Sequence, residues 1–165
     1  MNINLQQIAT IKTPFFKLDD MPVQPKGAKD TYATIEFKEE FQKGLKDLDG
    51  FSHVYLIYYF HKITEHKLFV IPFNDLNNKE RGVFSTRTPV HPNQIGLSIV
   101  ELISVENNIV TIKGVDILNN TPLLDIKPYI ENFDKIGTST KSGWMKSTKY
   151  EVSQKRSDDR FMNNS

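Results

Sequence analysis

The sequence contains no cysteine. Disulfide bonds, thiolate metal sites and cysteine nucleophiles are therefore excluded, and the absence is compatible with a reducing compartment. Long apolar runs are also missing, since the longest, Val54 to Phe60, has seven residues, whereas a membrane helix needs about 20. The N-terminus has no basic cluster followed by an apolar stretch. We therefore expect no signal peptide, no membrane contact and a cytoplasmic location.

The motifs of several common enzyme classes are absent as well. No two of the eight glycines have the GxG spacing of a dinucleotide-binding or Rossmann-type methyltransferase fold. There is no P-loop, HExxH or GxSxG motif, and the four histidines have no spacing typical of metal ligands. We expect no metal site.

The net charge is only +1, which points to no partner, but the charge is unevenly distributed. From residue 135 onward there are seven basic and three acidic residues, whereas the rest of the chain has 14 basic and 17 acidic residues. A basic tail on a mildly acidic body is compatible with a nucleic-acid contact, and the alternative is a solvated terminus with incidental lysines.

The remaining pattern is typical of an all-β protein. Apolar and β-branched segments predict seven or eight short strands, at residues 8–11, 31–37, 52–60, 68–71, 83–85, 96–105, 109–115 and 123–126. The run 52–60 predicts a strand that is buried on both faces or central to a sheet. One helix is expected over 38–49, where Phe41, Leu45 and Leu48 form a stripe that packs on the core. A barrel or sandwich of one domain follows.

The clearest hairpin joins 96–105 to 109–115 through Asn107 and Asn108, because asparagine tolerates the positive φ of tight turns. Gly114 in the second arm predicts a bulge or a close backbone approach. We expect the barrel domain to cover 1–134. Residues 135–165 form a basic tail, which Trp144 and Tyr150 tie in part to the body.

A stiff polar loop lies between two apolar strands. Pro89 and Pro92 restrict the backbone, and five side chains between them and around them offer hydrogen-bonding groups, namely Thr86, Arg87, Thr88, His91 and Asn93. A rigid loop of this kind is how a scaffold presents a site.

This loop, together with the segments Leu97–Leu102 and Thr121–Tyr129, resembles the TsaA-like family, whose best-known members are the TrmO-type tRNA methyltransferases. The family pattern is roughly GVFATRSPxRPNPIGLS followed by DGTPVLDIKPY. The resemblance spans about Ile8 to Tyr129. It implies a single-sheet antiparallel β-barrel, a tendency to form homodimers, and binding of S-adenosyl-L-methionine without a Rossmann fold.

The resemblance also implies the reaction, methylation of N6 of a threonylcarbamoyl-modified adenosine in tRNA. The implied cofactor-binding residues are Pro22, Val23, Gln24, His61, Lys62, Arg87, Leu97, Asp116, Ile117, Leu118 and Asn119. No catalytic residue is identified, although Asn93 stands where the family has asparagine.

The chemistry of three of these residues suits the cofactor. Arg87 offers a bidentate grip for the methionyl carboxylate, Asp116 an acceptor for ribose hydroxyls and Leu97 apolar cover for adenine. Purely structural roles remain open for the polar residues: Arg87 as a buried cap of loop carbonyls, Asp116 as a turn residue, and Asp125 with Lys127 as an ion pair at a strand end.

The chain departs from the family pattern at several positions. Val23, Lys62, His91, Gln94 and the pair Asn119-Asn120 replace arginine, glutamine, arginine, proline and Asp-Gly. Two cations are lost in these changes. Three functions therefore compete: a tRNA methyltransferase, a methyltransferase for another RNA or a small molecule, and a module that binds S-adenosyl-L-methionine or RNA without catalysis.

Overall fold

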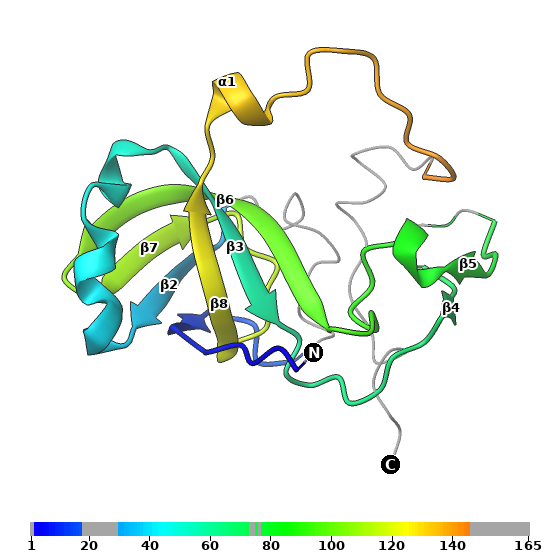
Figure 1. Ribbon diagram of the computed structural model, residues 1–165, viewed down its shortest axis with the longest axis horizontal. Coiled ribbons are helices and arrows are strands. Elements are labelled where there is room, and N and C mark those ends of the chain that lie inside the picture. The colour runs from blue at the N-terminus through cyan, green and yellow to red at the C-terminus, as the bar shows by residue number, and fades with distance from the viewer. Residues whose placement is uncertain (1, 18–29, 73–74, 76, 146–165) are drawn as a thin grey trace.

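The computed structural model describes residues 2–17, 30–72, 75 and 77–145. Within these ranges six antiparallel strands close into a barrel in the order β1-β2-β7-β6-β3-β8 (Figure 1). The strands are β1 (Ala9–Lys12), β2 (Tyr32–Phe37), β3 (His53–Tyr59), β6 (Ile95–Glu106), β7 (Ile109–Lys113) and β8 (Thr121–Pro128). The predicted all-β barrel is confirmed, with six barrel strands rather than seven or eight. No helix in the described ranges is long and apolar enough to cross a membrane.

The barrel interior is filled because side chains alternate along each strand, one face pointing inward and the other outward. Each of the six strands contributes fully or nearly fully buried side chains, among them Ile11, Ile35, Leu56, Val100, Ile112 and Leu123. This interdigitated core fixes the register of the strands, since a slip of one residue would turn the apolar set outward.

Strand β3 is central, as predicted, because it pairs with β6 on one side and with β8 on the other. The other alternative, that both faces of this strand are buried, is wrong. Val54, Leu56 and Tyr58 are buried, whereas Tyr55 and Ile57 lie on the outer face and are only half-buried. The continuous apolar run therefore reflects an apolar outer surface rather than a second core.

The predicted β6–β7 hairpin is confirmed, and Asn107 in its turn has a φ of 56°. The register shift of this pair lies between Leu102 and Ser104 of β6, so the bulge predicted at Gly114 is misplaced. Gly114 instead follows the end of β7 with a φ of 83°, a conformation that glycine adopts without strain.

The predicted helix over 38–49 is present as two 3₁₀ segments, η3 (Glu39–Leu45) and η4 (Leu48–Gly50). Asp47 between them has a φ of 66°, which a continuous right-handed helix does not allow. Leu45 is buried, and Phe41 and Leu48 pack against the core, so the predicted role of the stripe is confirmed. One α-helical turn that the sequence pattern missed, α1 (Glu131–Asp134), follows β8.

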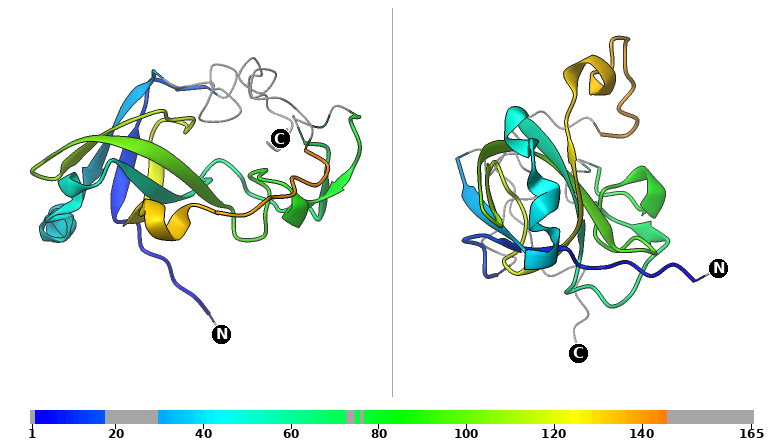
Figure 2. Two further views of the ribbon diagram at one scale, coloured as in Figure 1. Left: turned by 90° about the horizontal axis from the view of Figure 1, so that it is seen from above. Right: turned by 60° about the vertical axis from the view of Figure 1, so that its left-hand side comes forward.

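A small unit lies beyond the end of the barrel that is opposite to η3 (Figure 2). It contains a two-stranded hairpin, β4 (Phe69–Val70) with β5 (Arg81–Gly82), followed by the 3₁₀ turn η5 (Val83–Ser85). The strand predicted at 83–85 is wrong, because the amide and hydroxyl of Thr86 both donate to the carbonyl of Val83 and close a turn, at 2.9 and 2.7 Å. Ile63, Val70, Val83 and Val90 form the separate core of this unit.

Candidate functional site

Several of the predicted site residues lie at the barrel end that faces the small unit. There β3 ends opposite the start of β6, since Tyr59 pairs with Ile95. The amide of Phe60 donates to the carbonyl of Gln94 at 2.9 Å, and the hydroxyl of Tyr59 donates to the Gln94 side chain at 2.7 Å. The segment after β3 is thereby held against the segment before β6.

His61 and Lys62 occupy the turn that leaves β3. The amide of His61 donates to the carbonyl of Tyr59 at 2.9 Å, and the His61 side chain is half-buried. Burial lowers the pKa of His61, and the nearby charge of Lys62 lowers it further. At neutral pH the imidazole is therefore uncharged, which leaves the exposed Lys62 as the cation of this turn.

The small core joins this turn to the polar loop. Ile63 follows Lys62 directly and packs in the same cluster as Val83 and Val90. In addition, the amide of Lys67 donates to the carbonyl of Val90 at 3.0 Å. The segment that carries His61 and the loop that carries Arg87 therefore belong to one packed unit.

The polar loop is fixed from within. The hydroxyls of Thr86 and Thr88 are 2.9 Å apart, and Nε2 of His91 is 3.2 Å from the carbonyl oxygen of Thr86. Thr88 is buried, whereas Arg87 is exposed. Within the described ranges Arg87 makes no hydrogen bond or ion pair, so the alternative of a buried guanidinium that caps loop carbonyls is excluded. The internal hydrogen bonds of the loop fix its backbone, and the Arg87 guanidinium remains available to bind a ligand.

The turn Asp116 to Asn119 is tied to the chain that follows β1. Thr13 donates its hydroxyl to the carbonyl of Ile117 at 2.8 Å and its amide to the Asn119 side chain at 3.0 Å. The amide of Asn119 donates to the carbonyl of Phe15 at 2.7 Å, and the hydroxyl of Thr121 donates to that of Leu118 at 2.7 Å. Both the backbone amide and the side chain of Asn119 therefore form hydrogen bonds that fix this turn.

Asp116 points toward the inner side of the barrel end. Its carboxylate accepts a long hydrogen bond of 3.4 Å from the hydroxyl of Ser98, which in turn lies 3.2 Å from the hydroxyl of Tyr58. Burial raises the pKa of Asp116 to about 7 because the charged form loses its water. Burial also raises the pKa of Tyr58, so the phenol is neutral throughout the physiological range.

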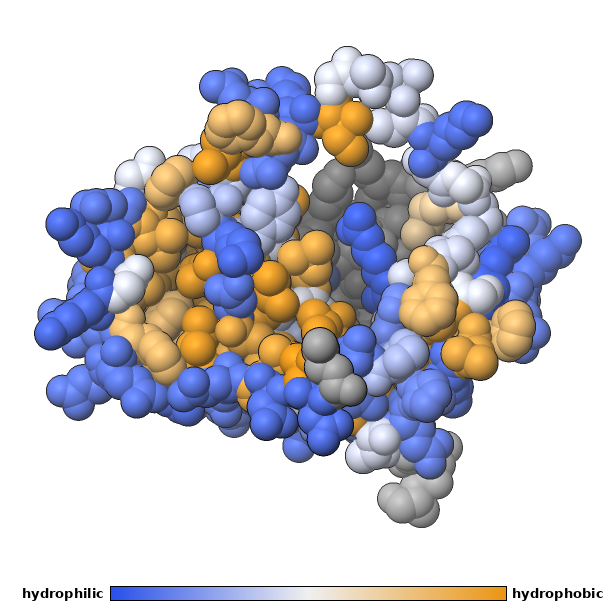
Figure 3. Space-filling model, viewed as in Figure 1, coloured by the Kyte–Doolittle hydropathy of each residue, from blue (hydrophilic) through white to orange (hydrophobic). Residues whose placement is uncertain are grey.

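Leu97 lies on the other face of the same strand. Its neighbour Ser98 points inward, whereas Leu97 points outward and is 62 % exposed. Leu97 belongs to an apolar surface that we call the outer apolar face, formed by Tyr55, Ile57 and Tyr59 of β3 opposite Ile99, Leu97 and Ile95 of β6. Figure 3 shows apolar side chains gathered over this part of the barrel.

The structure therefore unites some of the predicted residues and separates others. His61, Lys62 and Arg87 share the packed unit beside the barrel end, and Asp116 to Asn119 form a fixed turn at that end. The side chains of Leu97 and Asp116 do not meet, because they lie on opposite faces of the barrel wall. Pro22, Val23 and Gln24 lie outside the described residues.

Sequence reasoning missed the inward group of Tyr58 and Ser98. The signal that could have revealed it is Gly96, an isolated glycine at the start of a strand. A Cβ atom at this position would lie 2.2 Å from the ring of Tyr58, so only glycine leaves room for that ring. The close approach expected at Gly114 is found here instead. Elsewhere, the predicted strand-end ion pair of Asp125 and Lys127 is confirmed at 2.8 Å.

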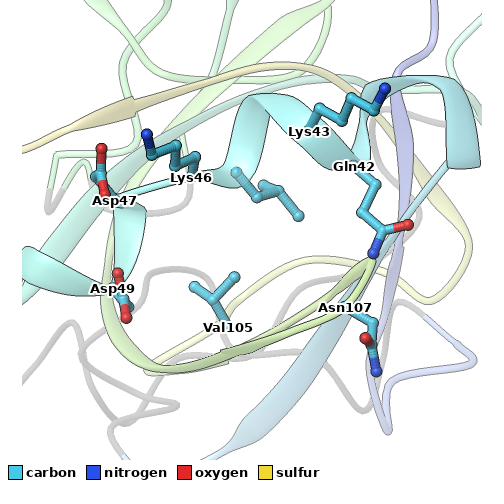
Figure 4. Close-up of a pocket in the computed structure, with 8 residues that line it drawn as sticks. Gln42, Lys43, Lys46, Asp47, Asp49, Val105 and Asn107 are labelled. Atoms are coloured by element: carbon cyan, nitrogen blue, oxygen red, sulfur yellow. The ribbon is translucent and has the colours of Figure 1, made fainter.

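A groove of about 460 Å³ lies at the opposite end of the molecule, between η3, η4 and the β6–β7 turn (Figure 4). Its lining carries charges of both signs, Lys43 and Lys46 with Asp47 and Asp49, and none of the predicted cofactor residues. Within the described ranges no three His, Asp or Glu residues are grouped as metal ligands.

Comparison with protein families identifies the domain. Residues 10–135 match the family model described as the tRNA-methyltransferase O N-terminal domain. The fold is similar to a crystal structure of TrmO, with a TM-score of 0.72 and 32% identity, over 86% of this chain and 64% of that chain. TrmO from Pseudomonas aeruginosa is similar with a TM-score of 0.70 and 31% identity, over 85% and 62% of the two chains.

Two of the named relatives are similar over most of this chain. A protein of Pyrococcus abyssi named "Probable S-adenosyl-L-methionine-binding protein" is 43% identical over 154 residues, which are 93% of this chain and 82% of that protein. The tRNA (adenine(37)-N6)-methyltransferase of Homo sapiens is 34% identical over 140 residues, 81% of this chain. The chain spans only 31% of the length of that human enzyme.

Proposed function

The chain belongs to the tRNA-methyltransferase O N-terminal domain family, and from this premise we propose that it transfers a methyl group from S-adenosyl-L-methionine to N6 of an adenosine in tRNA. The acceptor we propose is the threonylcarbamoyl-modified adenosine. The observation that carries the proposal is Arg87, an exposed guanidinium without a partner in the described ranges, on a loop that is fixed on both sides.

The described residues fit the polar end of the cofactor. S-adenosyl-L-methionine ends in a carboxylate, and a guanidinium binds a carboxylate through two parallel hydrogen bonds. Because the Arg87 backbone is held by the loop, less conformational freedom is lost on binding than from a mobile arginine.

Of the remaining predicted residues, Leu97 fits the nucleoside end. It presents exposed apolar surface for the adenine. Asp116 lies on the other face of the barrel wall, so it would not bind the same nucleoside directly, and we assign it the role of holding the start of β6 through Ser98. The turn from Ile117 to Asn119 is fixed by its own hydrogen bonds, and we assign it the role of holding Asp116 in place.

The bound cofactor supplies the methyl group, which passes to the acceptor nitrogen by in-line displacement. The protein contributes mainly by holding the donor and the acceptor in line, since positioning lowers the barrier of such a transfer substantially. Arg87 fixes one end of the donor and Leu97 the other. We assign no general base.

We also propose that two copies associate through the outer apolar face. Leu97, a predicted cofactor residue, belongs to this face, so a second copy would cover the adenine end of the site. A set of half-exposed and exposed aromatic and aliphatic side chains of this kind is typical of an interaction surface. We also propose a cytoplasmic location. The proposed tRNA substrate is found there, and the absence of cysteine is compatible with a reducing compartment.

A second function is favoured by one observation. The relative from Pyrococcus abyssi, of which this chain covers 82%, is named only for binding S-adenosyl-L-methionine. The alternative is therefore a module that binds the cofactor or RNA without transferring a methyl group.

Two measurements on the full chain separate these functions. Isothermal titration with S-adenosyl-L-methionine tests cofactor binding, and transfer of a labelled methyl group to tRNA that lacks this methylation tests catalysis. Binding with transfer to tRNA supports the proposed enzyme. Binding without transfer supports the module, transfer only to a small acceptor changes the substrate class, and absence of binding refutes the proposal.

A further inference from the structure

Trp144 connects the end of the described chain to the unit that carries Arg87. After α1 the chain runs from residue 135 to 145 across to η5, as both views show (Figures 1 and 2). Trp144 is the only tryptophan of the protein and lies beyond residues 10–135, which the family model covers. A residue outside the family domain thus reaches the candidate site from a distant part of the sequence.

Two contacts hold the Trp144 indole. Its Nε1–H donates to the carbonyl oxygen of Ser85 at 2.8 Å. The guanidinium carbon of Arg81 lies 5.3 Å from the centre of the ring, within the range of a cation–π interaction. Arg81 is itself fixed, because its Nε donates to the carboxylate of Asp75 at 2.7 Å, and the side chain of Asp75 is almost fully buried.

The contact with Ser85 acts on the loop just before Arg87. Ser85 is the last residue of η5, and Arg87 follows two residues later. On the other side of Arg87, Thr88 is buried and hydrogen-bonded to Thr86. The backbone at Arg87 is thus held by the small core on one side and by Trp144, through η5, on the other.

We propose that Trp144 is a positioning residue for Arg87, so that the segment after the barrel domain completes the S-adenosyl-L-methionine site. This inference rests on the proposed function, since Arg87 is the group that binds the cofactor carboxylate. Trp144 does not itself contact the cofactor. It restricts the loop before binding, and this lowers the entropy cost of ordering Arg87 around the ligand.

A double-mutant cycle tests whether Trp144 acts through Arg87. Trp144→Phe keeps an aromatic ring next to Arg81 and removes the hydrogen bond to Ser85. Titration with S-adenosyl-L-methionine is expected to show binding weakened about threefold to tenfold, the range for one lost hydrogen bond. In an Arg87→Ala background the same substitution should change the dissociation constant less than twofold, because coupled residues are not additive.

The matched control is Phe133→Ala, which removes an aromatic ring that is 84 % exposed on α1, just before the segment that leads to Trp144. This variant should bind S-adenosyl-L-methionine like the wild type. Thermal unfolding of each variant shows whether the fold is intact, and only variants with a wild-type transition enter the cycle. If Trp144→Phe does not keep that transition, the fluorescence response of Trp144 in the wild type and in Arg87→Ala tests the coupling in its place.

The single tryptophan also gives a direct spectroscopic readout. Addition of S-adenosyl-L-methionine should change the Trp144 fluorescence in a saturable way, with the dissociation constant found by calorimetry. The change should be lost in Arg87→Ala at ligand concentrations that still saturate the variant. A merely structural tryptophan would not respond to the loss of the Arg87 side chain in this manner.

The outcomes separate the inference from the function on which it rests. Failure of the wild type to bind S-adenosyl-L-methionine refutes the proposed function. Wild-type binding together with an unchanged dissociation constant in Trp144→Phe overturns the role of Trp144 and leaves the proposed function intact. An equal loss in the wild-type and Arg87→Ala backgrounds also overturns it, because Trp144 would then act independently of Arg87.

Discussion

Ser98 donates its hydroxyl to the carboxylate of Asp116 across 3.4 Å, joining the start of β6 to the turn after β7. This contact lies on the inner side of the barrel wall, next to the hydroxyl of Tyr58. It links a predicted cofactor residue to the core of the barrel. The ionisation of Asp116 is therefore expected to affect the stability of the fold as well as ligand binding.

The first prediction concerns pH. Burial raises the pKa of Asp116 to about 7, above its value in the unfolded chain. Between about pH 4 and pH 7 the folded state therefore holds a proton on Asp116 that the unfolded state has released. The contribution of Asp116 to the free energy of unfolding is complete below about pH 4 and falls as the pH rises to 7. The slope is at most about 1.4 kcal/mol per pH unit. Urea unfolding between pH 4 and 8 should show this fall in the wild type and a weaker one in Asp116→Asn; parallel pH profiles would contradict it.

The second prediction concerns Arg87. Arg87→Ala should weaken S-adenosyl-L-methionine binding by roughly 10-fold to 100-fold, the effect of losing charge-assisted hydrogen bonds to a carboxylate. The unfolding temperature should not change, because the side chain is exposed and unpaired in the described ranges. Lys43→Ala, at the groove on the opposite end of the barrel (Figure 4), is the control and should bind like the wild type. Unchanged affinity in Arg87→Ala would remove Arg87 from the site.

The third prediction concerns the packing of Gly96 against Tyr58. Gly96→Ala places a Cβ atom 2.2 Å from the Tyr58 ring and should lower the free energy of unfolding by about 1–3 kcal/mol or more. Gly82→Ala is a matched control, because nothing lies within 4 Å of its Cβ and its φ is −61°. Urea denaturation compares the two. Equal stabilities would show that the Tyr58 ring moves aside without cost.

The fourth prediction concerns Gln94, which replaces the proline of the family pattern. Gln94 has a φ of 52°, and its amide donates to the carbonyl of His91 at 3.0 Å. Proline requires a φ near −65° and has no amide hydrogen, so Gln94→Pro should destabilise the protein by about 3 kcal/mol or more. Gln94→Gly relieves the backbone strain while losing the bond from Tyr59, so the net change should be within about 1 kcal/mol. Urea unfolding measures both, and a tolerated proline would mean that the loop adopts the family conformation.

The fifth prediction concerns the outer apolar face. Ile99→Lys puts a charge at a position that is 45 % exposed on this face. If two copies associate through this face as proposed, sedimentation should show a dimeric wild type and a monomeric variant. Ile109→Lys is the control, since Ile109 is 40 % exposed on β7 opposite Glu106, at the end of β6 that does not pair with β3. A wild type that sediments as a monomer would refute the proposed association.

Most of the barrel could be predicted because its strands depend on local patterns. Alternation in 31–37 and the Asn-rich turn after 96–105 indicate β2 and the β6–β7 hairpin directly. One error falls where local hydrogen bonds override a strand-like pattern. Val83 to Ser85 has strand-like residues, yet the hydroxyl and amide of Thr86 close it into a turn.

The candidate site could be predicted only in part. The prolines and polar groups around Arg87 identified a loop that presents a site, and the structure leaves that arginine exposed. The sequence pattern did not indicate that Leu97 and Asp116 lie on opposite faces of the barrel wall. That separation depends on the inward direction of Ser98, which the pairing of β6 with β3 sets.

The sequence by itself determined the class of fold and the family, because alternating apolar residues, turn asparagines and two long motifs are properties of neighbouring positions. Only the tertiary structure decided which residues share a surface. Asp116 meets Ser98 across 18 positions and Trp144 meets Ser85 across 59. Such contacts arise when folding of the barrel and of the chain beyond it brings distant parts of the sequence together, and no local pattern records them.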